Sequence, residues 1–239
     1  MFFLSGRFTL TLAVVCALGA LLAGAGHRFG WWPLGFGFGA LRWFAYGAIA
    51  ATVLAIAGAI RARPGTGRSG FAASIVAIAV AAVTFGIPAT MLAKAKRVPP
   101  IHDITTDTAD PPKFVAILPL RASASNSTEY GGARVADQQK RAYPDIVPFE
   151  TPAPPDQAFA TALDAARGMG WDIVASVPAD GRIEATDTTL LFGFKDDVVI
   201  RVTPTSQGSR IDVRSESRVG GSDIGTNAKR IAAFLAKLK

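Results

Sequence analysis

The densest group of polar side chains lies near the carboxyl end of the 239-residue sequence. Its members are Arg214, Ser215, Ser217, Arg218, Ser222, Asp223, Asn227 and Arg230. Alternation along a strand predicts that one face carries acidic and basic side chains together, namely Asp212, Arg214, Glu216 and Arg218. One interpretation is a ladder of exposed ion pairs followed by a helix cap. The other is an anion or polar-headgroup site made by arginines near a helix N-terminus, which Arg201 on the neighbouring strand would join.

Two further groups contain side chains suited to acid–base or metal chemistry. His102 and Asp103, together with Asp107, form a weak candidate for a metal or acid–base cluster, although a hydrogen-bonded turn is the preferred interpretation. Asp196 and Asp197 resemble paired catalytic carboxylates, but they follow Lys195 where the strand pattern ends, which predicts a solvated turn. No catalytic residue, metal or cofactor is assigned.

The elements that would position these residues are predicted from periodicity between residues 156 and 239. A helix capped by Asp156 is followed by a hairpin, whose second strand is expected at Arg182 to Thr189. Two more strands lie around residues 198–203 and 211–217. A last helix is expected to begin at Ser222 or Asp223, with an apolar stripe of Ile224, Ala228, Ile231, Leu235 and Leu238. The order predicts an α+β domain in which two helices cover one face of an antiparallel sheet of about four strands.

Residues 99–155 have a different composition. They are rich in Pro, Ser and Gly, and several X-Pro steps exclude a continuous helix. The segment therefore predicts an extended, partly ordered arm in front of the compact domain.

The first 98 residues predict a membrane region. All 18 Asp and Glu residues follow position 100, whereas nine of the 25 Lys and Arg residues precede it, so the two parts carry +9 and −2. Apolar runs at about 8–25, 43–60 and 71–92 are each long enough for a transmembrane helix. Gly35, Gly37 and Gly39 predict a re-entrant or flexible connector before the second span, and Gly47, Ala51, Ala55 and Gly58 predict a small-residue packing face.

The charge distribution excludes some classes of function and leaves the topology open. The basic excess lies between apolar runs, which favours membrane-flanking charge over nucleic-acid binding. No Asp, Glu or Lys lies within a span, so the helices are interpreted as an anchor and not as an ion pathway. Lys and Arg counts on the two sides are nearly balanced, and the first span also fits a cleaved signal peptide. An odd number of spans from an inside N-terminus places the C-terminal domain outside the cytoplasm.

The C-terminal sequence resembles a family, the domain of unknown function 1499. The resemblance is carried by DGRIEATDTTLLFGFKDDVVIRV and by IDVRSESRVGGSDIGTNAKRIAAFL, with the upstream element PPIHDITTD. It covers about residues 99–239 and not the membrane region. The family is bacterial and plant, has no established activity to transfer, and often follows a signal or lipoprotein segment, which implies an extracytoplasmic domain.

Two functional hypotheses follow. The first is a multi-pass protein of the bacterial inner membrane, a non-catalytic component of the cell envelope whose domain binds a partner protein or a lipid. The alternative is an enzyme acting on envelope lipid or glycan, with the Arg214 to Arg230 cluster holding an anionic group.

Overall fold

The computed structural model describes residues 5–239 as two compact units. The first contains the chain up to Ala93 together with the short segment Leu190–Gly193. The second contains Lys94–Thr189 and Phe194–Lys239.

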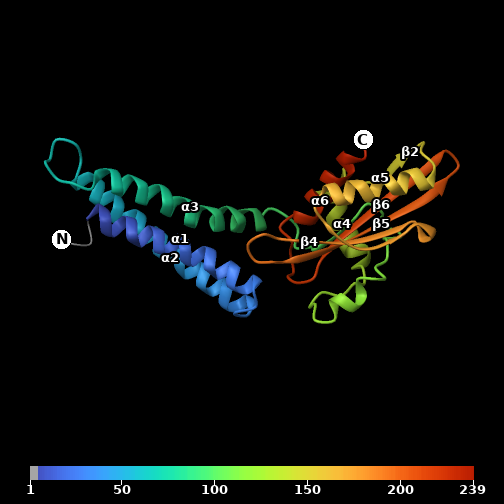
Figure 1. Cartoon of the computed structure of the whole chain (residues 1–239), viewed down its shortest axis with the longest axis horizontal. Helices are drawn as coiled ribbons and strands as arrows, with labels where there is room; N and C mark the ends of the chain where they lie inside the picture. The colour runs from blue at the N-terminus through green and yellow to red at the C-terminus, as the bar shows by residue number, and fades with distance from the viewer. Residues whose placement is uncertain (1–4) are drawn as a thin grey trace. The chain divides into compact units, whose positions relative to one another are not determined.

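Three helices in the first unit are long and apolar enough to cross a membrane. They are α1 (Gly6–Arg28), α2 (Leu34–Arg61) and α3 (Phe71–Ala95) (Figure 1). Small side chains allow close packing of the helices. Ala13 of α1, Ala51 of α2 and Ala77 of α3 are fully buried in one cluster, and a Cβ at Gly47 would lie 2.7 Å from the sulfur of Cys16. The predicted small-residue face of α2 therefore lies in this interface, with Ala51, Ala55 and Gly58 buried.

The second helix begins earlier than predicted. Gly35, Gly37 and Gly39 lie inside α2, which follows Pro33 directly, so the predicted connector is wrong. Pro33 supplies a helix start, because a proline at this boundary loses no helical hydrogen bond. The glycine at position 37 has a packing reason, since a Cβ there would lie 2.9 Å from the carbonyl oxygen of Ala23.

The second unit is an antiparallel sheet whose main path runs in the order β1-β6-β5-β4-β3, with β2 also paired to β6. The long central strands are β4 (Arg182–Thr188), β5 (Lys195–Thr205) and β6 (Gly208–Ser217). β3 (Asp172–Val177) forms one edge, and the short 3-10 turn η3 (Pro178–Asp180) joins it to β4. The fold class is as predicted, but the sheet has six strands and not four.

The two additional strands come from the Pro-rich segment. β1 (Asp103–Thr105) and β2 (Phe149–Thr151) have three residues each and pair with β6. Between them lie the 3-10 turn η2 (Leu118–Arg121) and the helix α4 (Gly132–Ala142). The segment predicted as an arm thus contributes to the sheet and also crosses it.

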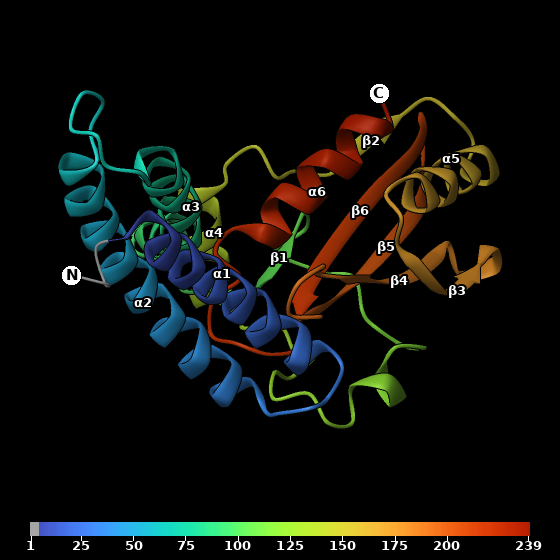
Figure 2. The same cartoon turned by 60° about the vertical axis from the view of Figure 1, so that its left-hand side comes forward.

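One face of the sheet is covered by two helices and the other by an irregular segment of the chain (Figures 1 and 2). Helices α5 (Pro155–Gly168) and α6 (Thr226–Lys237) cover one face. Their fully buried Ala162 and Phe234 pack with Ile200 and Val213 of the sheet, and Trp171 stacks on Phe234 at 5.4 Å. The opposite face carries alternate residues of the same strands and is covered by residues 107–130. We call this covering segment the arm.

Candidate functional site

The predicted polar cluster is divided by the sheet. Arg214 and Glu216 of β6 point to the arm face, because they pair across the strands with Val199 and Asp197. Ser215 lies between them and points to the opposite face, where its hydroxyl contacts Asn227 of α6. The cluster is therefore two networks and not one site.

Arg214 is the centre of the first network. Its Nε and Nη2 atoms donate to the two carboxylate oxygens of Asp103 on β1, at 2.9 and 2.8 Å. Nη2 also donates to the carbonyl of Thr128 at 2.7 Å, and the guanidinium lies 5.0 Å from the ring centroid of Phe114. Burial raises the pKa of Asp103, while the hydrogen bond from Arg214 lowers it. The bidentate pair with Asp103 and the ring of Phe114 together fix the orientation of the Arg214 guanidinium and occupy its donors and its face.

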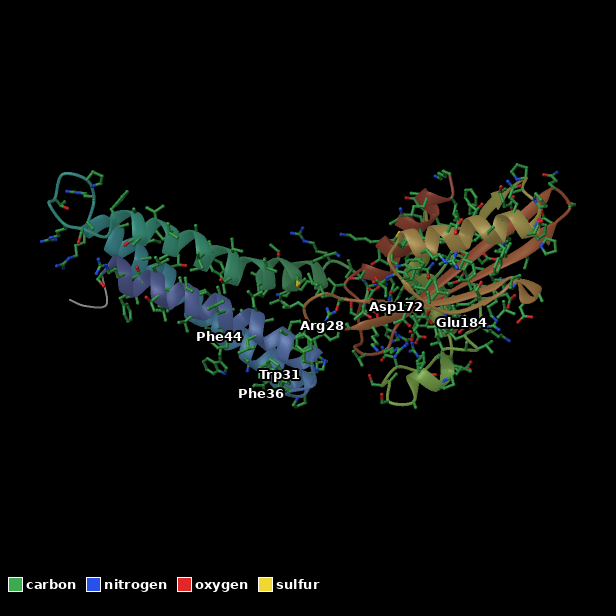
Figure 3. The ribbon with its side chains drawn as sticks, in the orientation of Figure 1. Arg28, Trp31, Phe36, Phe44, Asp172 and Glu184 are labelled. Carbon is green, nitrogen blue, oxygen red and sulfur yellow. The ribbon has the colours of Figure 1, made fainter. Side chains whose placement is uncertain are left out.

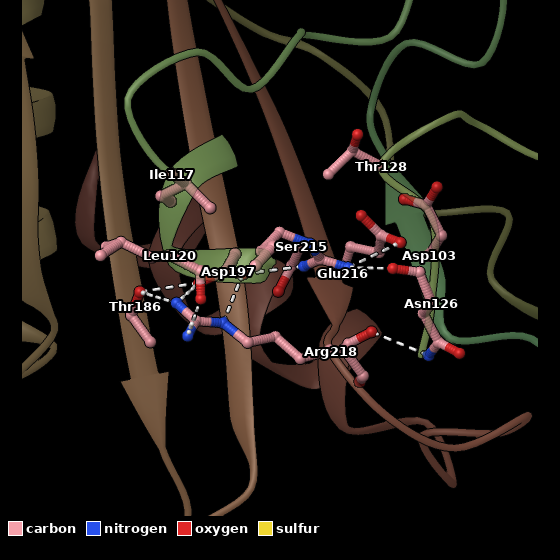
Figure 4. Close-up of polar contacts among 12 residues, drawn as sticks. Asp103, Ile117, Leu120, Asn126, Thr128, Thr186, Asp197, Ser215, Glu216 and Arg218 are labelled. Atoms are coloured by element: carbon pink, nitrogen blue, oxygen red, sulfur yellow. Dashed lines mark hydrogen bonds and ion pairs between the residues drawn. The ribbon is translucent and has the colours of Figure 1, made fainter. Parts of the chain in front are cut away.

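Arg218 and Arg121 share one carboxylate. Arg218 donates from Nε and Nη2 to the two oxygens of Asp197, each at 2.8 Å, and from Nη1 to the carbonyl of Leu120 at 3.0 Å (Figure 4). Arg121 of η2 donates to Asp197 at 2.8 Å as well. Asp197 is fully buried and also accepts from the hydroxyl of Thr186. The arm is thereby attached to the sheet at both Leu120 and Arg121.

Glu216 lies beside these pairs and is fully buried. Neither carboxyl oxygen has a hydrogen-bond partner among the described residues, although Nη2 of Arg121 lies 3.2 Å away. That distance brings electrostatic attraction without the alignment a hydrogen bond needs. Burial, assisted by the charges of Asp103 and Asp197, raises the pKa of Glu216 to about 8 against the opposing effect of Arg121 and Arg214. At neutral pH this carboxyl group therefore keeps its proton.

Glu184 of β4, labelled in Figure 3, binds backbone N–H groups of the arm. Its fully buried carboxylate accepts from the backbone N–H groups of Val115, Ala116 and Ile117 at 2.9–3.0 Å, and Arg182 donates to it as well. Three converging N–H donors fix the path of the chain at this point. Phe114 and Ile117 are buried beside Val199 of β5.

More ion pairs lie on the arm face of the sheet, farther along β5 and β6. Arg201 donates to Asp110, Asp212 and Asp107 at 2.9, 3.1 and 3.3 Å. Arg210 donates to Asp107 and Asp212 at 2.8 and 3.0 Å. Asp107 is thus an acceptor for arginines, and it does not lie in a cluster with His102.

The second network lies under α6. Arg230 donates to Asp187 at 2.8 Å and to Asp196 at 2.7 Å. Asn227 donates to Ser217 at 3.1 Å and to the carbonyl of His102 at 2.8 Å. These contacts join α6 to β4, β5 and β6 and to His102, which directly precedes β1. The network therefore attaches the helix to the sheet.

The loop before α6 contains the remaining predicted residues. The helix begins at Thr226, and Asp223 accepts from the N–H groups of Gly225 and Asn227, each at 2.7 Å. The Ser222 hydroxyl accepts from the N–H of Ile224 at 3.3 Å. Ile224 has a φ of 55°, a conformation that strains a β-branched residue. The carboxylate of Asp223 offsets this strain by satisfying the first N–H groups of the helix.

Comparison with known families gives one result. A family model described as a protein of unknown function (DUF1499) matches residues 103–238, which is more than half of the chain. The chain belongs to the DUF1499 family. Neither a curated protein nor a solved structure matches it. The match spans both networks and the arm, and it leaves the three apolar helices outside the family domain.

Two predictions about individual DUF1499 residues need correction. Asp196 and Asp197 do not lie in a solvated turn, because both are buried in β5. The ion pairs are also not an exposed ladder, since Arg214, Arg230 and their main carboxylate partners are largely buried. The buried carboxylates of β5 and the buried ion pairs have the same cause: an arginine that is remote in the sequence but in contact in the fold supplies the counter-charge that allows burial.

His102 lies at the edge of the first network. Its carbonyl accepts from Ser217 at 3.0 Å, whereas its buried Nδ1 has no hydrogen-bond partner among the described residues. It lines, with Asp103, Asn126 and Arg134, a hollow of about 390 Å³. Within residues 5–239 no three His, Cys, Asp or Glu side chains are arranged to hold a metal ion.

Sequence reasoning missed the residues through which the arm is attached. Arg121 and Glu184 were not candidates, and Asp197 was assigned to a turn. Arg121 gave no local signal, because its partner lies 76 positions later. Glu184 gave none either, because a polar residue that alternates with Ile183 and Ala185 is what a strand with one solvated face shows.

Proposed function

We propose that this DUF1499 protein is a multi-pass membrane protein whose domain is a non-catalytic binding module for a partner protein. The observation that carries the proposal is the arm. Its backbone is held by buried charges, while Val115, Leu118 and Leu120 are exposed by 52%, 46% and 51%. We call these three residues the arm ridge.

The arm combines a backbone fixed by hydrogen bonds with exposed apolar side chains, which is the arrangement of a preorganised recognition surface. The three N–H groups bound by Glu184 include that of Val115, and Arg218 holds the carbonyl of Leu120. A ridge fixed in advance loses little conformational entropy on binding. Exposed apolar groups gathered on one segment are typical of a protein-binding surface.

The chemistry of the ridge indicates its partner. An apolar face would cover the three side chains, and an acidic group beside it would pair with the exposed Lys113 at the start of the arm. The partner therefore combines an apolar contact surface with a carboxylate at its rim. We place this encounter outside the cytoplasm, at the inner membrane of a bacterial cell envelope, because three spans favour that side.

The enzyme hypothesis has less support from the geometry. It requires the arginines between positions 214 and 230 to receive an anionic group of a lipid or glycan. Arg214, Arg218 and Arg230 are instead each paired with at least one carboxylate at 2.7–2.9 Å. Such arginines already have their counter-charges, which supports a structural role for the motif.

Site-specific cross-linking in cells tests the ridge. A photoreactive benzoylphenylalanine at Leu118 of the full-length chain is expected to give a discrete protein adduct. The same residue at Val147, which is 54% exposed and lies outside the arm, is the matched control and should give none. Leu118→Asp should abolish co-purification of that partner while the domain keeps its cooperative melting. Adducts with lipid alone, or equal adducts at both positions, contradict the proposal.

A further inference from the structure

The loop between β4 and β5 has an unusual composition for a water-exposed turn. Residues 190–194 read Leu-Leu-Phe-Gly-Phe, and no charged residue lies between Asp187 and Lys195. Leu190 is 88% exposed, the highest value of any large apolar side chain in the described part of the chain. A soluble loop would place polar residues here.

The base of the loop is closed by two hydrogen bonds. The N–H of Thr189 donates to the carbonyl of Phe194, and the N–H of Phe194 donates to the Thr189 hydroxyl, each at 2.8 Å. Gly193 has a φ of 67°, which completes the turn without strain. Residues 190–193, which we call the apolar tip, therefore form a turn whose conformation is fixed by hydrogen bonds at its base.

The apolar tip belongs to the same compact unit as the three helices. The ring of Phe192 lies 5.2 Å from that of Phe38 in α2, and Arg28 at the end of α1 donates to the carbonyl of Leu190. Trp32 packs against Phe36 of α2 at 5.3 Å, and Trp31 lies close by at the same end of the helices (Figure 3). Tryptophans at a helix end mark the headgroup level of a bilayer. The tip thus shares its surroundings with residues typical of the membrane interface.

We propose that the apolar tip is a membrane-contact element, which inserts Leu190 into the boundary between headgroups and acyl chains. Its occupant is the lipid bilayer that holds the helices. Leu190 supplies the exposed apolar side chain that such an insertion needs. This surface is separate from the arm ridge, and the inference rests on the membrane part of the proposed function but not on partner binding.

Depth-dependent quenching tests the insertion. In the full-length chain, Cys16→Ala removes the only cysteine, and Leu190→Cys then allows a single environment-sensitive fluorophore to be attached. After reconstitution into vesicles, lipids brominated on the acyl chain are expected to quench this label strongly and to shift its emission to the blue. A label at Val147→Cys, on an exposed loop of the second unit, is the control and should be unaffected.

The outcomes separate lipid contact from burial in protein. A blue-shifted label that bromine does not quench would mean that protein covers Leu190, and a red, unquenched label would mean that water does. Either result overturns the proposal. Leu118→Asp, which removes part of the arm ridge, should leave the quenching at Leu190 unchanged, so failure of one proposal is distinguishable from failure of the other.

Discussion

At the scale of single residues, Glu216 makes stability depend on pH. Its pKa is raised from 4.5 to about 8 by burial, with Asp103 and Asp197 adding to the effect. The unfolded chain releases this proton near pH 4.5 and the native domain keeps it to about pH 8. Folding therefore becomes less favourable as pH rises through this window, and it is most favoured by this group below pH 4.5.

Glu216→Gln should remove that dependence. The variant is expected to gain stability over the natural domain as pH rises from about 5 to 8, reaching roughly 3–5 kcal/mol, since each pKa unit corresponds to about 1.4 kcal/mol. Urea unfolding of residues 94–239 at several pH values measures the difference. Parallel pH profiles for the two proteins would mean that Glu216 is ionised in the native state.

Arg218→Ala tests whether the buried pairs hold the fold. It leaves Asp197 with Arg121 as its one remaining arginine, so a loss of about 3–5 kcal/mol is expected. Arg167→Ala is the matched control, because Arg167 and Asp164 form an exposed pair, with 61% and 77% of the side chains accessible. Such a pair contributes about 0–1 kcal/mol. Equal effects of the two substitutions on the free energy of unfolding would refute a structural network.

At the scale of elements, the sequence predicted the strands and helices whose apolar residues recur at a regular spacing, and it missed the elements too short to show such a pattern. The alternation of β4, β5 and β6 and the stripe of α6 are regular over several residues, and these elements were found with errors of a few residues. β1 and β2 have three residues each, too few for a pattern. Lys195 to Asp197 read as a turn because the partners that neutralise Asp196 and Asp197 lie outside the strand.

The stripe of α6 gives a graded prediction. Ile231 and Phe234 are fully buried, whereas Leu235 is only partly buried at the edge of the core. Phe234→Ala should cost about 3–5 kcal/mol, because it leaves a cavity beside Trp171. Leu235→Ala should cost clearly less. Thermal melting of both variants checks the order, and the reverse order would place the wrong face of the helix in the core.

At the scale of the whole molecule, the second unit should fold without the helices. Residues 94–239 contain both faces of the sheet with their covering elements, and all of the acidic residues. The isolated segment is expected to be monomeric, soluble and cooperative in unfolding. Circular dichroism and sedimentation measure this. A segment that aggregates without its first 93 residues would show that the helices complete its core.

The orientation of the chain in the membrane is a separate prediction. An odd number of spans from an inside N-terminus puts the segment after Arg97 outside the cytoplasm. Alkaline phosphatase fused after residue 110 should therefore be active, and a cytoplasmic reporter at the same site should be silent. The reverse pattern would place the domain inside the cell.

The attachment of the arm also sets the order of events during synthesis. Thr128 and Arg214 are 86 positions apart, and Ile117 and Glu184 are 67 apart. The arm leaves the ribosome first, while the strand that neutralises it is made almost last. Contacts of such long sequence separation form slowly, and a chain grows from its N-terminus at about 5–20 residues per second. A polypeptide that stops before β6 has Glu184 and Asp197 but lacks Arg214, which binds the carbonyl of Thr128, and Arg218, which binds that of Leu120. Its arm is therefore only partly attached. Complete attachment of the arm therefore requires β6, so it is reached only after that strand has been made.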